Sequence, residues 1–214
     1  MCSFNSSCAK LTLGAIYISK DGNIAIMKKK YMKIWRAAIP YLKKGRRKDF
    51  VLHTRGVIKA MELLLKQENG NEDALIPAAI LHDTGWSKVP LDLQRTNDKA
   101  KIKRAMKMHL KYAASIIDEV LAKTGYNKKR IKTIIEIVLA HKFKNPRSLN
   151  KRLLIDADTL ADVFKDQFYG DCKAYNLRPE ALYNIRKNNK FYTETARKIF
   201  DKELEKRRKE FLDV

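Results

Sequence analysis

The chain has 214 residues, and 45% of them are hydrophobic, which suits one folded domain with at most an appendage and excludes a disordered chain. Glycine (8) and proline (5) are scarce, which argues against a turn-rich all-β fold. Lys and Arg number 46 against 24 Asp and Glu, a formal net charge of +22. Such an excess indicates an anionic partner, whether nucleic acid, membrane surface or phosphorylated small molecule, although a lysine-rich solvated surface explains it equally well.

The chain has few cysteines, and their spacing fits no common cysteine motif. There are three, Cys2, Cys8 and Cys172, and no CxxC occurs, which argues against a disulfide scaffold and a cysteine-type zinc site. No apolar run approaches the ~18 residues of a membrane span. No basic segment precedes the weak apolar stretch 11–18, so a signal peptide is not expected. We therefore expect a cytoplasmic protein without a membrane partner.

The first 27 residues differ from the rest, because apolar residues alternate around the turn-like segment 20–23. That pattern predicts a short hairpin or a loose tail. From residue 28 the pattern is helical, and breaks are expected at Gly45, Gly70, Gly85 with Pro90, Gly125, Pro146, Gly170 and Pro179. The expected helices cover 28–44, 48–68, 72–83, 98–124, 128–142, 149–169, 178–188 and 190–212. The predicted fold class is all-α, a single compact helical bundle over 28–214.

The chain has four histidines, and each falls in a predicted helix or at its end, one on each of four successive helices. They are His53, His82, His109 and His141. A single histidine beside an apolar face is more often structural than functional. However, His82-Asp83 directly follows the apolar segment 75–81, and a buried His-Asp pair needs partners or a metal. Helices of a bundle can direct four such ligands at one point in the core.

Two acids compete for a place beside these histidines. In the helix expected over 149–169, Asp158 lies at one edge of the apolar face and Asp156 at the opposite edge. Helical spacing alone places Asp156 only slightly less well, so both remain candidates.

The ordered set His53, His82-Asp83, His109, His141 and Asp158 resembles the HD superfamily of metal-dependent phosphohydrolases. The segment 78–85, Ala-Ala-Ile-Leu-His-Asp-Thr-Gly, is very similar to the central motif of that superfamily. The resemblance covers about 50–165, with weaker similarity over 191–200. It departs from the family at Trp86, where many members carry lysine. No Gly-Tyr-Pro follows, since Asn127 comes after Gly125-Tyr126, which disfavours the cyclic-dinucleotide branch.

The resemblance implies a set of metal ligands. One metal would be held by His53, His82, Asp83 and Asp158, and a second by His109 and His141 with Asp83 bridging. Imidazole and carboxylate ligands without thiolate suit Mn, Fe, Co, Ni or Zn, as one or two ions. Asp158 is preferred because of the family's Ala-Asp-x-Leu-like pattern. Asp156 or Asp162 would then be available to orient a ligand histidine.

The positive charge is concentrated in the segment that carries two of the candidate ligands. Residues 86–152 hold 18 Lys and Arg against 5 Asp and Glu. Five of these side chains lie near ligands in the sequence and are candidates to bind phosphate: Lys88, Lys111, Lys142, Lys144 and Arg147. Each alone is more often solvated surface. Lys142 adjoins a ligand at a helix end, so we expect it, together with Asp83, to be catalytic.

The leading hypothesis is a phosphomonoesterase, phosphodiesterase or pyrophosphohydrolase of the HD type. It would act through metal-activated hydroxide on a small phosphorylated substrate, with a nucleotide preferred. One alternative is a di-iron oxygenase of the inositol oxygenase type, which has a similar ligand set. Another is a non-catalytic RNA-binding module, which is not favoured because no helix-turn-helix, zinc finger or RNP signature occurs. The amphipathic C-terminal segment is a candidate contact for a homodimer.

Overall fold

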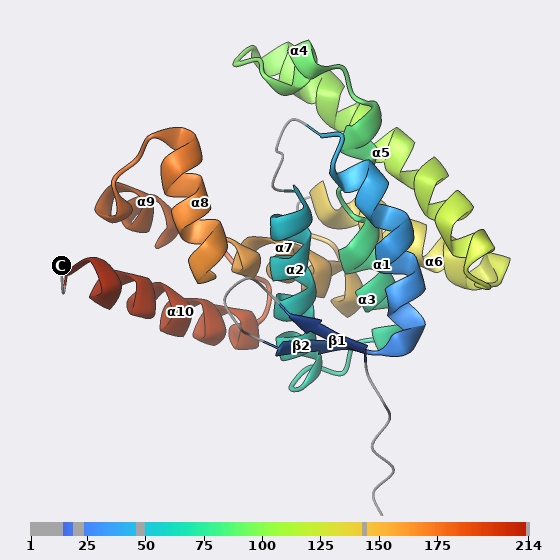
Figure 1. Cartoon of the computed structure of the whole chain (residues 1–214), viewed down its shortest axis with the longest axis horizontal. Helices are drawn as coiled ribbons and strands as arrows, with labels where there is room; N and C mark the ends of the chain where they lie inside the picture. Colours follow the sequence, from blue (N-terminus) through green and yellow to red (C-terminus); the bar gives the residue numbers. More distant parts are fainter. Residues whose placement is uncertain (1–14, 19–23, 46–49, 143–144, 213–214) are drawn as a thin grey trace, which may run out of the picture.

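The computed structural model describes residues 15–18, 24–45, 50–142 and 145–212. It begins with two short strands, β1 (Ala15–Ile18) and β2 (Ile24–Met27), which pair antiparallel with Ala15 opposite Met27 and Ile18 opposite Ile24. The pairing agrees with the hairpin alternative of the sequence prediction; the residues between the strands lie outside the described ranges. Figure 1 shows the two strands side by side.

Helices make up the rest of the described structure, which confirms the all-α class. They are α1 (Lys29–Leu42), α2 (Phe50–Leu65), α3 (Glu72–Leu81), η1 (Thr84–Lys88), α4 (Leu91–Gln94), α5 (Lys99–Lys123), α6 (Lys128–Leu139), η2 (Ala140–Lys142), α7 (Leu149–Ala161), α8 (Lys165–Tyr175), α9 (Pro179–Arg186) and α10 (Glu194–Leu212). Here η marks a 3-10 helix. No helix in these ranges is long and apolar enough to cross a membrane.

Helix α3 forms the centre of the bundle. Every residue from Ala74 to Leu81 is buried, as expected for an apolar helix surrounded by other helices. It packs against α1, α2, α6 and α7, and Figure 1 shows it among them. Its C-terminal end therefore places the residues that follow, His82 and Asp83, inside the protein.

Side-chain caps explain why several predicted helix starts are right. Asp98 accepts a hydrogen bond from the Lys101 backbone N–H at the start of α5, and Asn127 and Ser148 cap α6 and α7 in the same way. A capping side chain satisfies a backbone donor that the helix itself leaves without an acceptor. Such residues are visible in the sequence, so the predicted starts fall within one residue of the observed ones.

The prediction of one helix over 149–169, ending at Gly170, is wrong. Helix α7 ends at Ala161, and α8 begins at Lys165 and continues through Gly170. Arg186 from α9 donates to the Asp162 carbonyl and pairs with Asp171 on α8. This buried arginine satisfies a carbonyl at the end of α7. A contact made by a residue so much later in the chain has no signal in local periodicity.

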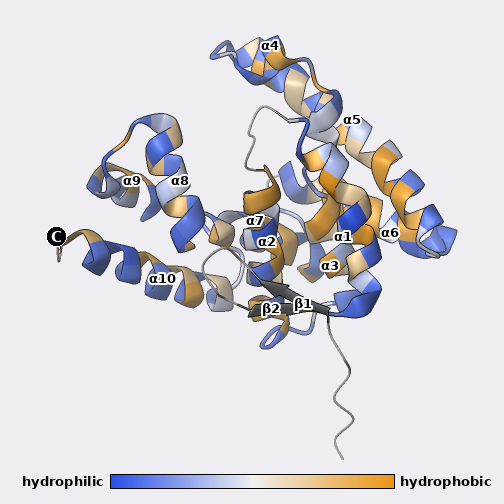
Figure 2. Ribbon diagram, in the orientation of Figure 1, coloured by the Kyte–Doolittle hydropathy of each residue, from blue (hydrophilic) through white to orange (hydrophobic). Residues whose placement is uncertain are grey.

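The last three helices form a lobe beside α7, on the left of Figure 1. Helix α10 begins at Glu194 rather than at the predicted residue 190. Asp156 of α7 accepts hydrogen bonds from the backbone N–H groups of Tyr192 and Thr193, both 2.8 Å, and from Thr193 Oγ1, 2.7 Å. Figure 2 shows hydrophilic and hydrophobic turns alternating along α10, as expected for a helix with one packed face.

Candidate metal centre

The structure brings all four histidines together with Asp83 and Asp158. His53 lies on α2, His109 on α5 and His141 in η2, whereas His82 and Asp83 directly follow α3. The exposed fraction of each histidine is 5% or less. Neighbouring imidazole rings have centroids 5.5 to 5.6 Å apart along the series His53, His82, His141 and His109. Residues spread over 106 positions therefore share one buried cluster, with Asp158 of α7 at its edge.

Asp83 lies at the middle of this cluster. Its Oδ2 atom is 3.3 Å from His82 Nε2 and 3.8 Å from His53 Nε2. Its Oδ1 atom is 3.7 Å from His109 Nε2 and 4.0 Å from His141 Nε2. Two donor atoms bound to one transition metal are roughly 3.0–3.4 Å apart, given bonds of about 2.1 Å. The observed separations of 3.3 to 4.0 Å are near this spacing or slightly above it. Each oxygen of Asp83 faces a different pair of histidines.

Asp158 faces the cluster from the other side. Its Oδ1 atom lies 2.9 Å from His53 Nε2 and 3.6 Å from His82 Nε2. Its Oδ2 atom lies 3.1 Å from Lys142 Nζ. The donor atoms form two groups that could each hold a metal ion, namely His53, His82 and Asp158, and Asp83, His109 and His141, with the atoms of each group within 4.8 Å of one another.

The unpaired atoms of the cluster fit a metal. Buried nitrogen and oxygen atoms without a hydrogen-bond partner include the Nε2 atoms of His82, His109 and His141 and the Oδ1 atom of Asp83. Burying such groups without a partner is costly. The Nδ1 atoms of His82 and His141 donate to the carbonyls of Ala79 and Val138, which leaves the Nε2 lone pair of each neutral ring free to bind a metal.

The carboxylates hold a proton on the cluster in the metal-free protein. Burial alone would lower the pKa of His82, but the carboxylates of Asp83 and Asp158 raise it to about 10. Burial lowers the pKa of His109 to about 4 and that of His141 well below its usual value. Burial favours a higher pKa for Asp83, but the charge of His82 holds this pKa well below the usual range. The cluster is thus poised to exchange a proton for a cation.

Lys142 is a cation that touches the cluster. Burial lowers its pKa, but the carboxylates of Asp158 and Asp83 outweigh this and raise it above the usual value. Its side chain is 27% exposed and that of Asp158 is 19% exposed, whereas those of the histidines are 6% exposed or less. Lys142 therefore remains an ammonium ion at the most accessible edge of the cluster.

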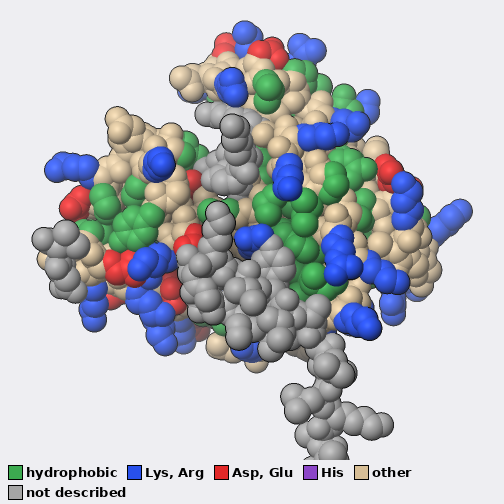
Figure 3. Space-filling view, in the orientation of Figure 1, with side chains coloured by type: hydrophobic (Ala, Val, Ile, Leu, Met, Phe, Trp, Pro, Cys, Tyr) green, Lys and Arg blue, Asp and Glu red, His purple; other side chains and the backbone are tan. Residues whose placement is uncertain are grey.

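Of the other predicted phosphate-binding residues, the three that the structure describes do not contact the cluster. Lys88, Lys111 and Arg147 are exposed, and none forms an ion pair or hydrogen bond with a cluster residue in the part of the chain that the structure describes. Lys111 follows His109 by two residues on α5, which turns it to the opposite side of that helix. Lys144 lies outside the described residues. Figure 3 shows Lys and Arg scattered over the visible face rather than gathered in one patch.

The structure separates the roles of the three acids on and after α7. Asp158 faces the histidines, whereas Asp156 is fully buried and binds the start of α10. Asp162 lies 3.6 Å from the Arg186 guanidinium. Among the described residues, neither Asp156 nor Asp162 hydrogen-bonds a histidine of the cluster, so the expected orienting role has no support for either.

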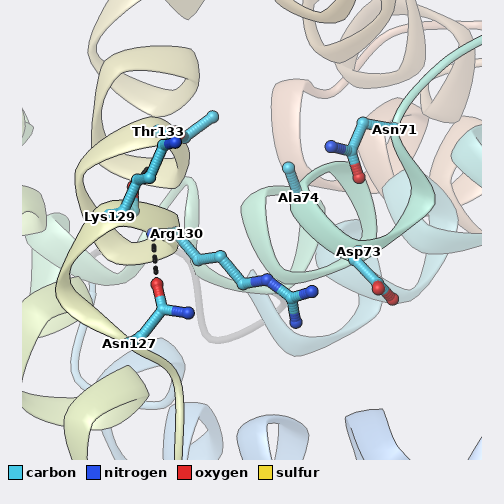
Figure 4. A pocket seen from close by; sticks show the side chains of 7 residues that line it. All are labelled: Asn71, Asp73, Ala74, Asn127, Lys129, Arg130 and Thr133. Atoms are coloured by element: carbon cyan, nitrogen blue, oxygen red, sulfur yellow. Dashed lines mark hydrogen bonds between the residues drawn. The ribbon is translucent and has the colours of Figure 1, made fainter.

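A hollow at the protein surface lies away from this cluster. It is lined by residues from the N-terminal turns of α3 and α6, among them Asn71, Asp73, Asn127 and Arg130 (Figure 4). His82 and His141 follow the C-terminal ends of the same two helices, at least about 15 Å further along each axis at 1.5 Å per residue. The chemistry-bearing side chains therefore do not belong to the hollow.

In the sequence, Trp86 stands out only as a departure from the family, and its contact with the cluster is not predicted. Its ring stacks on His109 with centroids 4.6 Å apart and planes 13° apart. The side-chain amide of Gln94, which the sequence did not single out, donates to the carbonyls of Trp86 and Val89. An aromatic residue three positions after an HD pair was the available signal; the Gln94 contact had none.

Comparison with known proteins gives one family. The family model of the HD domain matches residues 50–162, more than half of the chain, and this range contains all the residues of the cluster. No curated protein and no solved structure matches the chain. The histidine and aspartate pattern, its convergence in the fold and the match over 50–162 agree, and the chain belongs to the HD domain family.

Proposed function

We propose that the protein is a metal-dependent phosphohydrolase that acts on a small phosphorylated substrate, with a nucleotide preferred. One observation carries the proposal: the carboxylate of Asp83 lies 3.3 to 4.0 Å from the Nε2 atom of every histidine in the chain. A carboxylate between four imidazoles is suited to link two cations. Family membership supports metal-dependent hydrolysis as the chemistry of such a site.

The residues present can be assigned to the metals. His53, His82 and Asp158 would hold one ion, and His109 and His141 the other, with Asp83 shared between them. When bound, divalent ions lower the pKa of water to about 7 and polarise a phosphoryl oxygen. The donor set contains no thiolate, which favours Mn, Fe, Co, Ni or Zn held by nitrogen and oxygen.

Lys142 would act on the substrate as a positive charge. Since its pKa is raised by neighbouring carboxylates, it stays protonated and cannot accept a proton. It is well placed to bind a phosphate oxygen and to offset the negative charge that develops during phosphoryl transfer. Asp158 holds this ammonium group with one oxygen and faces the histidines with the other.

The exposure of the cluster favours a small reacting group. The histidines are almost fully covered, and the accessible edge is formed by Asp158 and Lys142. A phosphate could reach the cluster from this edge, beside Lys142, while the rest of the substrate stays outside. Access from this edge suits a phosphate ester or anhydride of a small molecule better than a bond in the interior of a bulky molecule.

The test combines metal analysis with a substrate panel. Purified protein would be analysed for bound metal and assayed for phosphate release from nucleotides, phosphomonoesters and phosphodiesters, with Mn, Co or Ni added. Asp83→Asn should abolish both metal retention and hydrolysis, whereas Lys111→Gln, on the outer face of α5, should change neither.

Two outcomes would redirect the assignment. A coloured protein with two irons that consumes oxygen would favour the oxygenase. Steeply salt-dependent RNA binding without hydrolysis of any substrate would favour a binding module. Full metal content in Asp83→Asn would contradict the proposed centre itself.

A further inference from the structure

The histidines of the cluster differ in what holds their rings. His82 and His141 lie at helix ends, where carbonyls of the last turn are not used by the helix, and each donates from Nδ1 to the carbonyl three residues earlier. His53 is bonded to Asp158. In contrast, both ring nitrogens of His109 are buried without a hydrogen-bond partner. His109 lies inside α5, where preceding carbonyls already accept helix N–H groups.

The His109 ring, which has no hydrogen-bond partner, is stacked on the indole ring of Trp86. The two rings are nearly parallel, with planes 13° apart and centroids separated by 4.6 Å. The Phe50 ring is also nearly parallel to Trp86, at 13° and 6.5 Å. Aromatic rings in such arrangements attract beyond the effect of area burial. A flat ring stacked on the imidazole restricts rotation of the imidazole plane, and an aliphatic side chain in the same place cannot do so.

The backbone around Trp86 is fixed against α5. A Cβ atom at Gly85 would lie 2.1 Å from the His109 carbonyl oxygen and 2.7 Å from the Ala113 backbone nitrogen, so η1 approaches α5 more closely than any other residue type allows. On the other side, Gln94 Nε2 donates to the Trp86 carbonyl at 3.1 Å and to the Val89 carbonyl at 2.7 Å. The indole therefore lies against His109 on a rigid support.

We propose that Trp86 is a positioning residue that sets the ring plane of His109 by stacking, in place of the hydrogen bond that orients His82 and His141. The inference rests on the proposed metal centre but not on hydrolysis. Affinity for metal at the Asp83, His109 and His141 group then depends on Trp86. Affinity at the His53, His82 and Asp158 group does not.

The test compares two substitutions of similar size, Trp86→Phe and Trp86→Leu, in the full chain. Both fill part of the same space, but only phenylalanine presents a ring. Metal-free protein would be titrated with Mn²⁺ against a fluorescent chelator, and His53→Ala and His109→Ala would identify each binding step. Trp86→Leu should weaken the step lost in His109→Ala by about tenfold, the size seen when groups that orient metal ligands are removed. Trp86→Phe should bind as the wild type does.

A spectroscopic measurement keeps the proposal testable if Trp86→Leu folds poorly. In the wild type, NMR signals of the His109 ring protons should be shifted upfield relative to those of the other histidines, because they lie over the indole. Trp86→Phe should keep a shift of the same sign. The other tryptophan, Trp35, is buried in α1, and Trp35→Phe should leave both the shift and metal binding unchanged.

The possible failures can be told apart. If the wild type binds no metal, the proposed metal centre fails. If it binds metal, but the two Trp86 variants weaken it equally, weaken the other step or leave it unchanged, only the positioning role is overturned. An unshifted His109 signal in the wild type would also overturn it.

Discussion

The two oxygens of the Asp158 carboxylate contact different side chains: Oδ1 lies 2.9 Å from His53 Nε2, and Oδ2 lies 3.1 Å from Lys142 Nζ. One carboxylate thus joins the candidate ligands to the cation at their accessible edge. Because Lys142 is not one of the candidate metal ligands, replacing it with a neutral side chain should affect the reaction of the substrate more than the binding of metal.

We predict that Lys142→Gln lowers kcat/KM for phosphate release by about 10- to 100-fold, because a hydrogen bond to a charged group contributes about 1.5–3 kcal/mol. Metal content should stay near that of the wild type. Steady-state kinetics and metal analysis of the same preparation check both parts. Lys111→Gln is the matched control, since Lys111 is an exposed lysine on the opposite side of α5 from His109. Equal rates in the two variants would remove Lys142 from the site.

Asp156 and Asp158 should respond differently to removal. Asp156→Ala leaves three donors of Tyr192 and Thr193 without their acceptor, which should lower the free energy of unfolding by about 1–3 kcal/mol. Its metal content should be unchanged. Asp158→Ala should instead lose metal. Urea unfolding and metal analysis of both variants decide the matter, and loss of metal from Asp156→Ala alone would reverse the two roles.

The same pair shows how far sequence reasoning reaches. Periodicity placed both acids at edges of one apolar face, and the family pattern selected Asp158. The Asp156 carboxylate instead accepts hydrogen bonds from Tyr192 and Thr193 at the start of α10. No local sequence pattern reveals a contact between residues 36 positions apart. For the same reason the sequence does not predict the break between α7 and α8, where Arg186 of α9 donates to the Asp162 carbonyl.

The histidines could be predicted from the sequence because the chain has only four and each follows or joins an apolar stripe that the fold must bury. The lysines could not be predicted, because a flexible charged side chain is placed by local geometry rather than by burial. Of the five basic candidates, Lys142 alone among the described ones touches the cluster.

The metal-free protein should be most stable near pH 6.5. The pKa of His82 is raised from 6.5 to about 10, so the protonated ring stabilises the fold fully below pH 6.5, and this contribution is lost as the pH rises toward 10. The pKa of His109 is lowered from 6.5 to about 4. The unfolded chain therefore takes up that proton first as the pH falls, and stability declines between 6.5 and 4.

Thermal unfolding of chelator-treated protein across this pH range measures the effect. His82→Gln should flatten the alkaline side of the profile, because the alkaline decline depends on the His82 proton. A wild-type profile that rises steadily to alkaline pH would show that Asp83 and Asp158 do not hold this proton.

Two glycines should give opposite results with the same substitution. At Gly85, a Cβ atom would lie 2.1 Å from the His109 carbonyl oxygen, and backbone atoms cannot move aside as a flexible side chain can. We expect Gly85→Ala to lower the free energy of unfolding by about 1–3 kcal/mol, the usual effect of overpacking. At Gly170, inside α8, a Cβ atom would have Leu52 Cδ2 as its nearest neighbour outside the adjoining helix backbone, at 3.9 Å. Gly170→Ala should raise stability by up to about 1 kcal/mol, because alanine favours the helix.

Urea unfolding of the metal-free variants compares the two directly, since the side-chain change is identical and only the surroundings differ. Gly85→Ala should also weaken metal binding at the Asp83, His109 and His141 group, because η1 must move away from α5 and take Trp86 with it. Gly170→Ala should bind metal as the wild type does, since α8 supplies none of the ligands. If Gly85→Ala were as stable as Gly170→Ala, the close approach of η1 to α5 would be wrong, and with it the support for the Trp86 ring.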